Sequence, residues 1–202
     1  GEGAIRLQAN TFERLVLGQM HETVGPTDAD DRVNFYLQVL ADKTGSLIAA
    51  AAKSGVIFSN APREYEEPVR VFGEAAGVAF QLLDDVIDLS ADPDETGKVP
   101  GTDLRAGVPT MPYLLLARRD DPDARALRER IDDGVARIAE GEDPALLDEP
   151  LAMLRADRST DETVDLANAW SSDAIAALDP IPDGPVREAL TRFAQAVADR
   201  SS

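Results

Sequence analysis

Residues 72–89 read FGEAAGVAFQLLDDVIDL, which has the period of a helix with an unusually wide apolar face. Each residue of an α-helix advances by about 100°, so the polar side chains fall within a single arc of about 100°. Those side chains are Glu74, Gln81, Asp84, Asp85 and Asp88. A helix on a protein surface shows the reverse proportion, with a narrow apolar stripe. The pattern therefore predicts a helix from about Arg63 to Leu89 that is packed on most sides and exposes one acidic strip.

The acidic strip indicates a cationic partner. Carboxylates within two helical turns repel one another, and they are costly beside an apolar wall unless a cation joins them. Asp84 and Asp88 project from the same face, close enough to share that partner. Magnesium binds through one or two carboxylates together with waters and substrate phosphates. One hypothesis is therefore an aspartate-rich wall that binds Mg²⁺ and a diphosphate, and the alternative is a strip that faces solvent or pairs with arginines.

Helical periodicity continues on both sides of this segment. Residues 2–24 predict an amphipathic helix whose apolar face holds Ile5, Phe12, Leu15, Val16, Leu17 and Met20. A second long helix is expected from Asp30 or Asp31, either of which can cap it, to about Ile57. Shorter helices are expected near 113–118, 122–140, 144–156, 160–178 and 185–200. Strand-like alternation is absent from the sequence, so we expect a single all-α domain over residues 1–202.

Composition excludes several classes of function. The 202 residues carry 38 acidic and 20 basic side chains, a formal net charge of −18, which argues against nucleic-acid binding. An anionic substrate would therefore need a metal ion or a local cluster of cations. The absence of cysteine excludes disulfides, thiolate metal sites and cysteine nucleophiles. No apolar run has the length of a transmembrane span, so the expected compartment is the cytoplasm.

Two of the three lysines lie at places where they could contact a phosphate. Lys98 stands between glycines in the polar stretch 90–109, and a lysine on such a loop can reach a phosphate. Lys43 and Thr44 precede the small, apolar run 47–52. Taken alone, that position favours a lysine that buries its stem and keeps its ammonium in water.

Together these segments resemble the trans-polyprenyl diphosphate synthases. The run from Gly77 to Asp88 is similar to the second aspartate-rich motif of that family, and Lys43-Thr44 is similar to its Lys-Thr pair. The other matching elements are Gly18-Gln19-Met20-His21-Glu22, Gly97-Lys98, Gly101-Thr102-Asp103-Leu104-Arg105 and Thr110-Met111-Pro112. Their order and separations fit over about residues 10–115, while the remainder agrees in helical character alone.

The resemblance implies an isoprenoid synthase-like helical bundle around a central cavity, normally in a homodimer. Enzymes of this family join isopentenyl diphosphate head to tail onto an allylic diphosphate, with Mg²⁺ as the cofactor. Carried onto this sequence, the metal ligands would be Asp84 and Asp85, with Asp88 in support. The substrate-contacting residues would be Lys43 and Lys98 on the allylic diphosphate, Thr44 and Gln81 near the carbocation, Asp103 on a metal-bound water, and Gln19 on the wall.

The sequence departs from the family pattern in two places. The first aspartate-rich motif, which the family carries well upstream, is absent from the 202 residues, and the chain begins with Gly1 instead of Met. We therefore expect the C-terminal two-thirds of a longer enzyme, lacking the N-terminal helices and inactive alone. Val108 stands where the family often has a lysine, in a variant typical of the branch that makes long menaquinone side chains. Two alternatives stay open: a class I terpene synthase, and a non-catalytic subunit of a heteromeric synthase.

Overall fold

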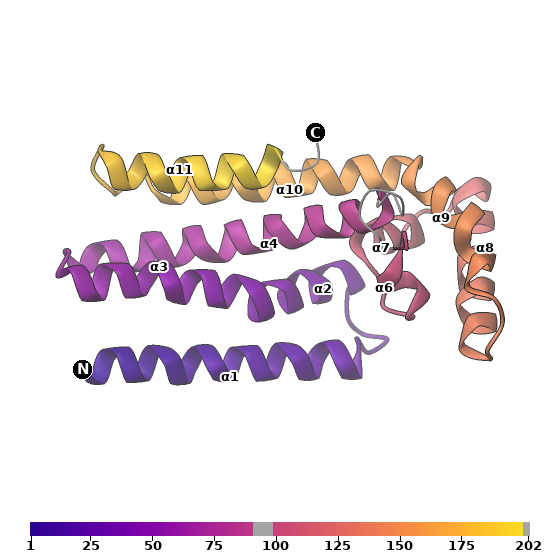
Figure 1. The fold of residues 1–202 in the computed structure, drawn as a ribbon, viewed down its shortest axis with the longest axis horizontal. Coiled ribbons are helices and arrows are strands. Elements are labelled where there is room, and N and C mark those ends of the chain that lie inside the picture. The colour runs from indigo at the N-terminus through magenta and orange to yellow at the C-terminus, as the bar shows by residue number, and fades with distance from the viewer. Residues whose placement is uncertain (91–98, 200–202) are drawn as a thin grey trace. The chain divides into compact units, whose positions relative to one another are not determined.

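The computed structural model describes residues 1–90 and 99–199, in which every regular element is a helix (Figure 1). The chain divides into two compact units. The first consists of Gly1–Gln81 and the segment that begins at Leu166, and the second consists of Leu82–Asp165. That the two units form the single domain expected from the sequence stays a prediction.

The first unit begins with three consecutive helical segments. Helix α1 spans Glu2–Val24, as predicted, and α2 spans Arg32–Leu40. A short π-helix, Ala41–Gly45, then joins α2 to α3, Ser46–Ser59. Asp31 caps α2, because its carboxylate accepts a hydrogen bond from the backbone N–H of Asn34 at 2.9 Å. The predicted second helix is thus confirmed in extent, and the π-helix within it is new.

Helix α4 is the long apolar helix of the sequence. A 3₁₀ turn at Arg63–Tyr65 leads into α4, Glu66–Ser90. Its apolar residues are buried on most sides, as the pattern predicts: Val69, Phe72, Ala75, Ala76, Val78, Ala79, Leu82, Leu83, Val86 and Leu89. The core of the first unit joins some of these to buried residues of α10, Arg158–Ala177, and α11, Pro185–Ala198. Packing on several sides explains why this helix lacks the broad polar face of a surface helix.

The expected apolar face of α1 lies at the surface. Ile5, Phe12 and Met20 are 71%, 67% and 55% exposed, and Gly18 is the one buried residue of the helix. Helix α1 meets the π-helix at Gly18, where an added Cβ would lie 2.9 Å from Asp42 Cβ and 3.1 Å from Lys43 Cγ. The helical period therefore predicted the helix correctly, and much of its apolar face is exposed among the described residues.

The second unit consists of short helices. They are α6, Thr102–Arg105; α7, Met111–Ala117; α8, Pro122–Ala139; the 3₁₀ turn Pro144–Leu147; and α9, Asp148–Arg155. Their core includes Leu116, Leu127, Ile131 and Leu154. Among the described residues, no helix combines the length and apolarity needed to cross a membrane. The helices expected near 113–118 and beyond are confirmed to within a few residues.

An ion pair anchors the start of α10 in this second unit. Arg119 Nη1 lies 2.7 Å from Asp157 Oδ1, and the backbone N–H of Ser159 donates to the same oxygen at 2.8 Å. Burial raises the pKa of Asp157, but hydrogen bonds from Ser159 and Arg119 outweigh it and hold the pKa below its ordinary value. Asp157 therefore stabilises the fold in its charged form.

Candidate active site

Lys43 and Thr44 lie on the π-helix Ala41–Gly45. Short π segments within α-helices are rare and occur frequently at functional sites. The neighbouring Asp42 is only 8% exposed, and its carboxylate accepts hydrogen bonds from Arg14 Nε at 2.8 Å and Gln38 Nε2 at 3.0 Å. The backbone carbonyl of Asp42 accepts a further bond, from Ser46 Oγ at 2.6 Å. The segment that carries Lys43 is therefore fixed from several directions.

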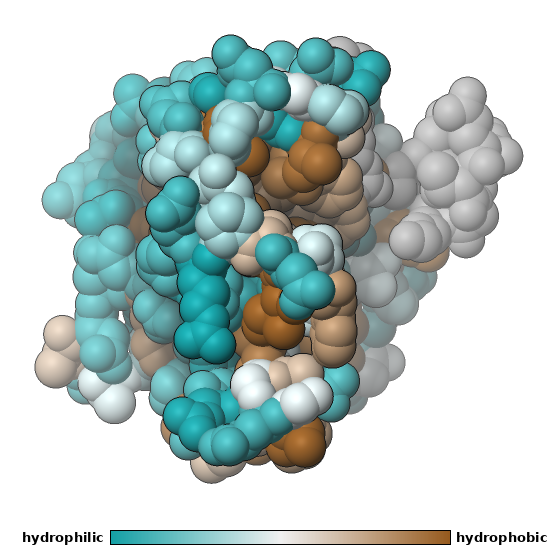
Figure 2. Space-filling view, turned by 90° about the vertical axis from the view of Figure 1, so that its left-hand side faces the viewer, coloured by the Kyte–Doolittle hydropathy of each residue, from teal (hydrophilic) through white to brown (hydrophobic). Residues whose placement is uncertain are grey.

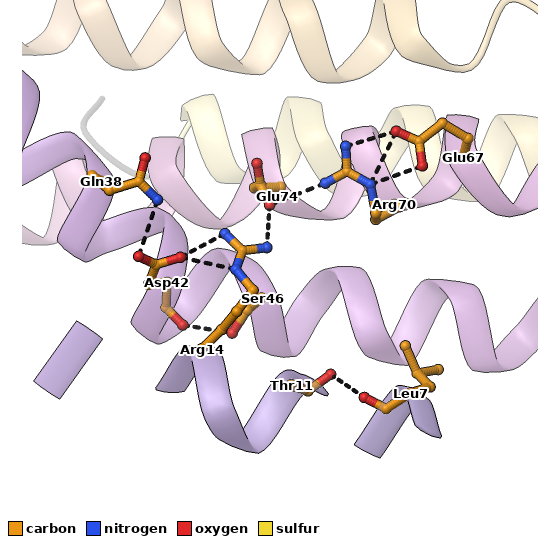
Figure 3. A network of polar contacts seen from close by, with 9 residues as sticks. All are labelled: Leu7, Thr11, Arg14, Gln38, Asp42, Ser46, Glu67, Arg70 and Glu74. Carbon is orange, nitrogen blue, oxygen red and sulfur yellow. Dashed lines mark hydrogen bonds and ion pairs between the residues drawn. The ribbon is translucent and has the colours of Figure 1, made fainter. Parts of the chain in front are cut away.

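Arg14 links this segment to α4, as Figure 3 shows. Its Nη1 donates to Glu74 Oε2 at 2.6 Å, and Arg70 donates to the same oxygen at 3.1 Å. Burial lowers the pKa of Arg14, but hydrogen bonds to Glu74 and Asp42 outweigh burial and raise it. The guanidinium thus stays charged and bridges two carboxylates that would otherwise repel each other.

Glycines let the backbones of α1, the π-helix and α4 approach closely. A Cβ added at Gly77 would lie 2.6 Å from Gly45 Cα, and one added at Gly45 would lie 2.9 Å from the carbonyl oxygen of Glu74. A Cβ at Gly18 would lie 2.9 Å from Asp42 Cβ. Since real Cβ atoms do not approach other atoms this closely, these three positions, here called the glycine seam, require glycine.

The glycine seam brings Thr44 and Gln81 together. Thr44 Oγ1 lies 3.1 Å from Gln81 Oε1, so the hydroxyl can donate to the amide oxygen. Both side chains are partly exposed, which leaves the hydroxyl oxygen and the amide nitrogen available to a ligand. Two residues separated by 37 positions, both predicted from the sequence to contact substrate, are therefore neighbours.

Lys43 makes an ion pair with α1. Its ammonium nitrogen lies 2.5 Å from Glu22 Oε2, and Gln19 Nε2 donates to the same oxygen at 2.8 Å. Gln19 is exposed, while the side chains of Lys43 and Glu22 are 28% and 31% exposed. The structure thus brings Gln19 and Lys43 together around Glu22.

The three aspartates of α4 have different surroundings in the second unit. Asp84 is exposed, with no hydrogen-bond or ion-pair partner among residues 1–90 and 99–199. Asp85 is 4% exposed, and its Oδ2 accepts a bond from the backbone N–H of Met111 at 2.9 Å. Asp88 accepts weaker bonds from the backbone N–H groups of Thr102 and Asp103, at 3.3 and 3.5 Å.

The electrostatics favour a cation beside Asp88. Burial raises its pKa, and the nearby charges of Asp103 and Asp84 raise it further, against the lowering effect of the two backbone hydrogen bonds. A raised pKa means that the charged carboxylate is under strain in its surroundings, which a bound cation would relieve. Asp84 and Asp103 are therefore the acidic neighbours that disfavour a charged Asp88.

A family model described as polyprenyl synthetase matches residues 2–142, which is more than half of the chain. The chain belongs to the polyprenyl synthetase family. The family resemblance expected from the sequence is thereby confirmed, although this match does not distinguish the menaquinone branch.

Curated members of the family cover nearly all of this chain. Nonaprenyl diphosphate synthase of Mycobacterium tuberculosis is 39% identical over 200 residues, which is 99% of this chain and 58% of that protein. Octaprenyl diphosphate synthase of Escherichia coli is 34% identical over 197 residues, which is 97% of this chain and 59% of that protein. The chain therefore spans a little under three-fifths of the length of these relatives.

A solved structure confirms the fold. The geranylgeranyl pyrophosphate synthase of Corynebacterium glutamicum, determined in complex with calcium and isoprenyl diphosphate, superimposes with a TM-score of 0.84 at 36% identity. The match covers 100% of this chain and 60% of that one. The all-helical isoprenoid synthase fold predicted for this polyprenyl synthetase family member is thus confirmed, for the part of the fold that the chain spans.

The donor chemistry of this family member fits a hard divalent cation. Asp84, Asp88 and Asp103 offer carboxylate oxygens, the ligands that magnesium and calcium prefer. In the described ranges, no three acidic or histidine side chains are arranged so that they could hold a metal ion. Magnesium commonly takes one or two protein carboxylates and completes its shell with water and substrate phosphates, so such a prearranged group is not required. The ligand roles of Asp84, Asp85 and Asp88 stay predictions, and the burial of Asp85 favours a positioning role for it.

Three residues of the site have no role in the sequence-based prediction, and one predicted residue is not described. Arg14 holds the π-helix through Asp42, 28 positions away, and Glu22 holds Lys43 across 21 positions. Contacts across such separations leave no periodic signal in a single sequence. Lys98 lies outside the described residues, so its predicted contact with the diphosphate stays a prediction.

Proposed function

We propose that this family member contributes the second half of the active site of a trans-polyprenyl diphosphate synthase. The reaction would join isopentenyl diphosphate head to tail onto an allylic diphosphate and release inorganic diphosphate. The observation that carries the proposal is the pairing of Thr44 with Gln81 on α4, the same helix that carries the exposed Asp84. A sequence selected for packing alone has no need of three aspartates within five residues, one exposed and two at least partly buried, on a helix that is otherwise apolar.

The allylic diphosphate must lose its C–O bond, and the leaving group takes the electron pair and gains negative charge. Lys43, and Lys98 with it, would hold that diphosphate, since cations placed there stabilise the transition state more than the ground state. Asp84 and Asp88 would hold Mg²⁺, which supplies additional positive charge to the diphosphate oxygens when bound. Asp103 would hold a metal-bound water.

The allylic carbocation left behind needs electron-rich neighbours and protection from water. The oxygens of Thr44 and Gln81 would face it, and Gln19 would form part of the wall. The double bond of isopentenyl diphosphate then attacks the cation, and the released diphosphate is a suitable base for the proton that is lost. Apolar side chains around the cation would exclude water and so prevent premature quenching.

The proposal extends to the assembly. The relatives are longer than this chain, and the first aspartate-rich motif of the family is absent from its 202 residues. We propose that the chain alone is inactive, that the active protein is a homodimeric, cytoplasmic enzyme, and that it belongs to the menaquinone side-chain branch.

The test is a chain-elongation assay of the protein as its gene encodes it, with Mg²⁺, isopentenyl diphosphate and an allylic diphosphate. Replacing Asp84 by Asn should lower turnover by about a hundredfold or more, because removing one interaction with developing charge costs about that factor. Thermal stability should hardly change, since Asp84 is exposed.

Asp173→Asn is the matched control, since Asp173 is also an exposed aspartate within a helix, α10. That variant should keep wild-type turnover. Equal losses of stability and activity in Asp84→Asn would contradict a metal-binding role. Product formed from the allylic diphosphate alone would instead identify a class I terpene synthase, and activity that requires a longer homologous chain would identify a subunit of a heteromeric synthase.

A further inference from the structure

The ammonium group that should bind the diphosphate already has an anionic partner. Lys43 Nζ lies 2.5 Å from Glu22 Oε2. The other carboxylate next to Lys43 in sequence, Asp42, is occupied by Arg14 and Gln38. Glu22 is therefore the carboxylate that neutralises Lys43 in this structure.

The glycine seam explains why Lys43 reaches Glu22. A Cβ at Gly18 would lie 3.1 Å from Lys43 Cγ, so the lysine stem crosses α1 directly over Gly18. Glu22 is four residues further on and hence on the same face of α1, one turn along. Gln19 donates to Glu22 Oε2 at 2.8 Å and so holds the carboxylate toward Lys43. The contact is therefore built by three positions of α1 and is not a chance meeting of long side chains.

A carboxylate at this position must oppose a diphosphate. The ammonium is a compact charge, and a neighbouring carboxylate cancels much of its attraction for a second anion. We infer that Glu22 is a competing counter-ion that weakens the binding of diphosphate groups at Lys43, an inference that rests on the proposed role of Lys43. Diphosphate binding then requires Lys43 to leave Glu22 or to share its donors. The same competition speeds the loss of the inorganic diphosphate that each condensation releases.

The test is isothermal titration calorimetry of inorganic diphosphate in the presence of Mg²⁺, on the chain as its gene encodes it. Glu22→Gln keeps the size of the side chain and removes its charge. We expect it to bind diphosphate about threefold more tightly, a change within the range measured for partly exposed ion pairs. The KM for the allylic diphosphate should also fall, because freeing the lysine strengthens its binding to the diphosphate already in the ground state.

Glu13→Gln is the matched control. Glu13 is an exposed glutamate of the same helix, nine residues earlier and hence on its opposite side, and it has no ion-pair partner within the described ranges. Removing its charge should leave the affinity at the wild-type value. Glu22→Gln should also have no effect when Lys43 is replaced by Met, because Glu22 acts through Lys43. Thermal melts of each variant verify that it is folded.

Two outcomes separate this inference from the proposed function. If Lys43→Met weakens diphosphate binding while Glu22→Gln leaves it unchanged or weaker, Glu22 is not a competitor and the role of Lys43 stands. If Lys43→Met leaves the affinity unchanged, Lys43 does not bind diphosphate, and both the inference and that part of the proposed function fail.

Discussion

Replacing Gly77 by alanine should push α4 away from the π-helix. The new Cβ would lie 2.6 Å from Gly45 Cα, 2.9 Å from Gly45 N and 3.2 Å from Thr44 C. All three are backbone atoms, so no side chain can rotate away to relieve the overlap. Ordinary contact begins near 3.4 Å, and the two segments must therefore separate by about 1 Å.

The expected change in the free energy of unfolding is the sum of two opposing effects. Overpacking of this kind costs about 1–3 kcal/mol, while alanine is favoured over glycine within a helix by about 1 kcal/mol. We expect a net loss of about 1 kcal/mol, which lowers Tm by about 2–4 °C in a protein of this size. The separation would also stretch the 3.1 Å contact between Thr44 and Gln81 beyond hydrogen-bonding distance.

Gly55→Ala supplies the control. Gly55 lies within α3, and a Cβ added there would meet no heavy atom within 4 Å. The same substitution should therefore raise stability by about 0.5–1 kcal/mol. Thermal and urea unfolding followed by circular dichroism measure both changes. If Gly77→Ala stabilised the protein as much as Gly55→Ala does, the close approach of α4 to the π-helix would be refuted.

Three further predictions concern charged groups. Arg14→Met should cost about 2 kcal/mol in urea unfolding, because it leaves the buried Asp42 short of a cationic partner, and recovery of full stability in an Arg14→Met, Asp42→Asn double variant would verify the cause. Asp85→Ala should cost about 1–3 kcal/mol, because the backbone N–H at the start of α7 loses its buried acceptor; a Tm equal to that of the wild type would rule out this structural role. Asp157→Asn should be less stable than the wild type at pH 7, and the difference should begin to shrink near about pH 4 and disappear only as the pH falls through the lowered pKa of the folded state, since the stabilisation belongs to the charged carboxylate; a difference that does not shrink in acid would contradict this.

Most of the fold could be predicted from the sequence because its local signals agree. The apolar residues of α4 recur in every direction except one, and burial follows directly from that pattern. Proline and glycine at the ends of the other helices set their limits to within a few residues. The apolar face of α1 was predicted but its exposure was not, since a helical period shows that a face is apolar but not which segment covers it. Here α1 meets the π-helix at Gly18, where the side chains of Asp42 and Lys43 leave no room for a Cβ.

The site was predictable in its residue types and less so in their surroundings. Lys43, Thr44 and Gln81 were predicted through a family resemblance, and the structure places Thr44 against Gln81. The sequence treats Asp84 and Asp85 alike, whereas the structure exposes one and buries the other. A helical wheel cannot make that distinction, because it depends on Met111, which lies 26 residues beyond Asp85.

The first unit also contains an apolar cavity that the sequence does not predict. This cavity of about 600 Å³ lies between the second half of α3 and the segment that leads into α11. Figure 2 shows hydrophobic residues gathered among hydrophilic ones at this end of the unit. The walls of the cavity include Ala52, Tyr65 and Leu190. None of the predicted site residues that the structure describes lines it. Pockets formed by segments more than a hundred positions apart depend on the tertiary packing of helices, which one sequence does not specify.

The π-helix has a consequence for how this protein can change by insertion or deletion. It places one residue more in its turn than an α-helix does, so deleting a single residue from Ala41–Gly45 would let a regular α-helix form. Because the extra residue is taken up within the π turn itself, α2 and α3 would keep their relative orientation after such a deletion, and the change would be confined to the turn. The turn would then lose the local backbone shape that presents Asp42, Lys43 and Thr44 to α1 and α4. A one-residue length change is therefore compatible with the helices but not with the contacts of the π-helix, and lineages that keep those contacts should keep the count between Arg32 and Ser59 constant.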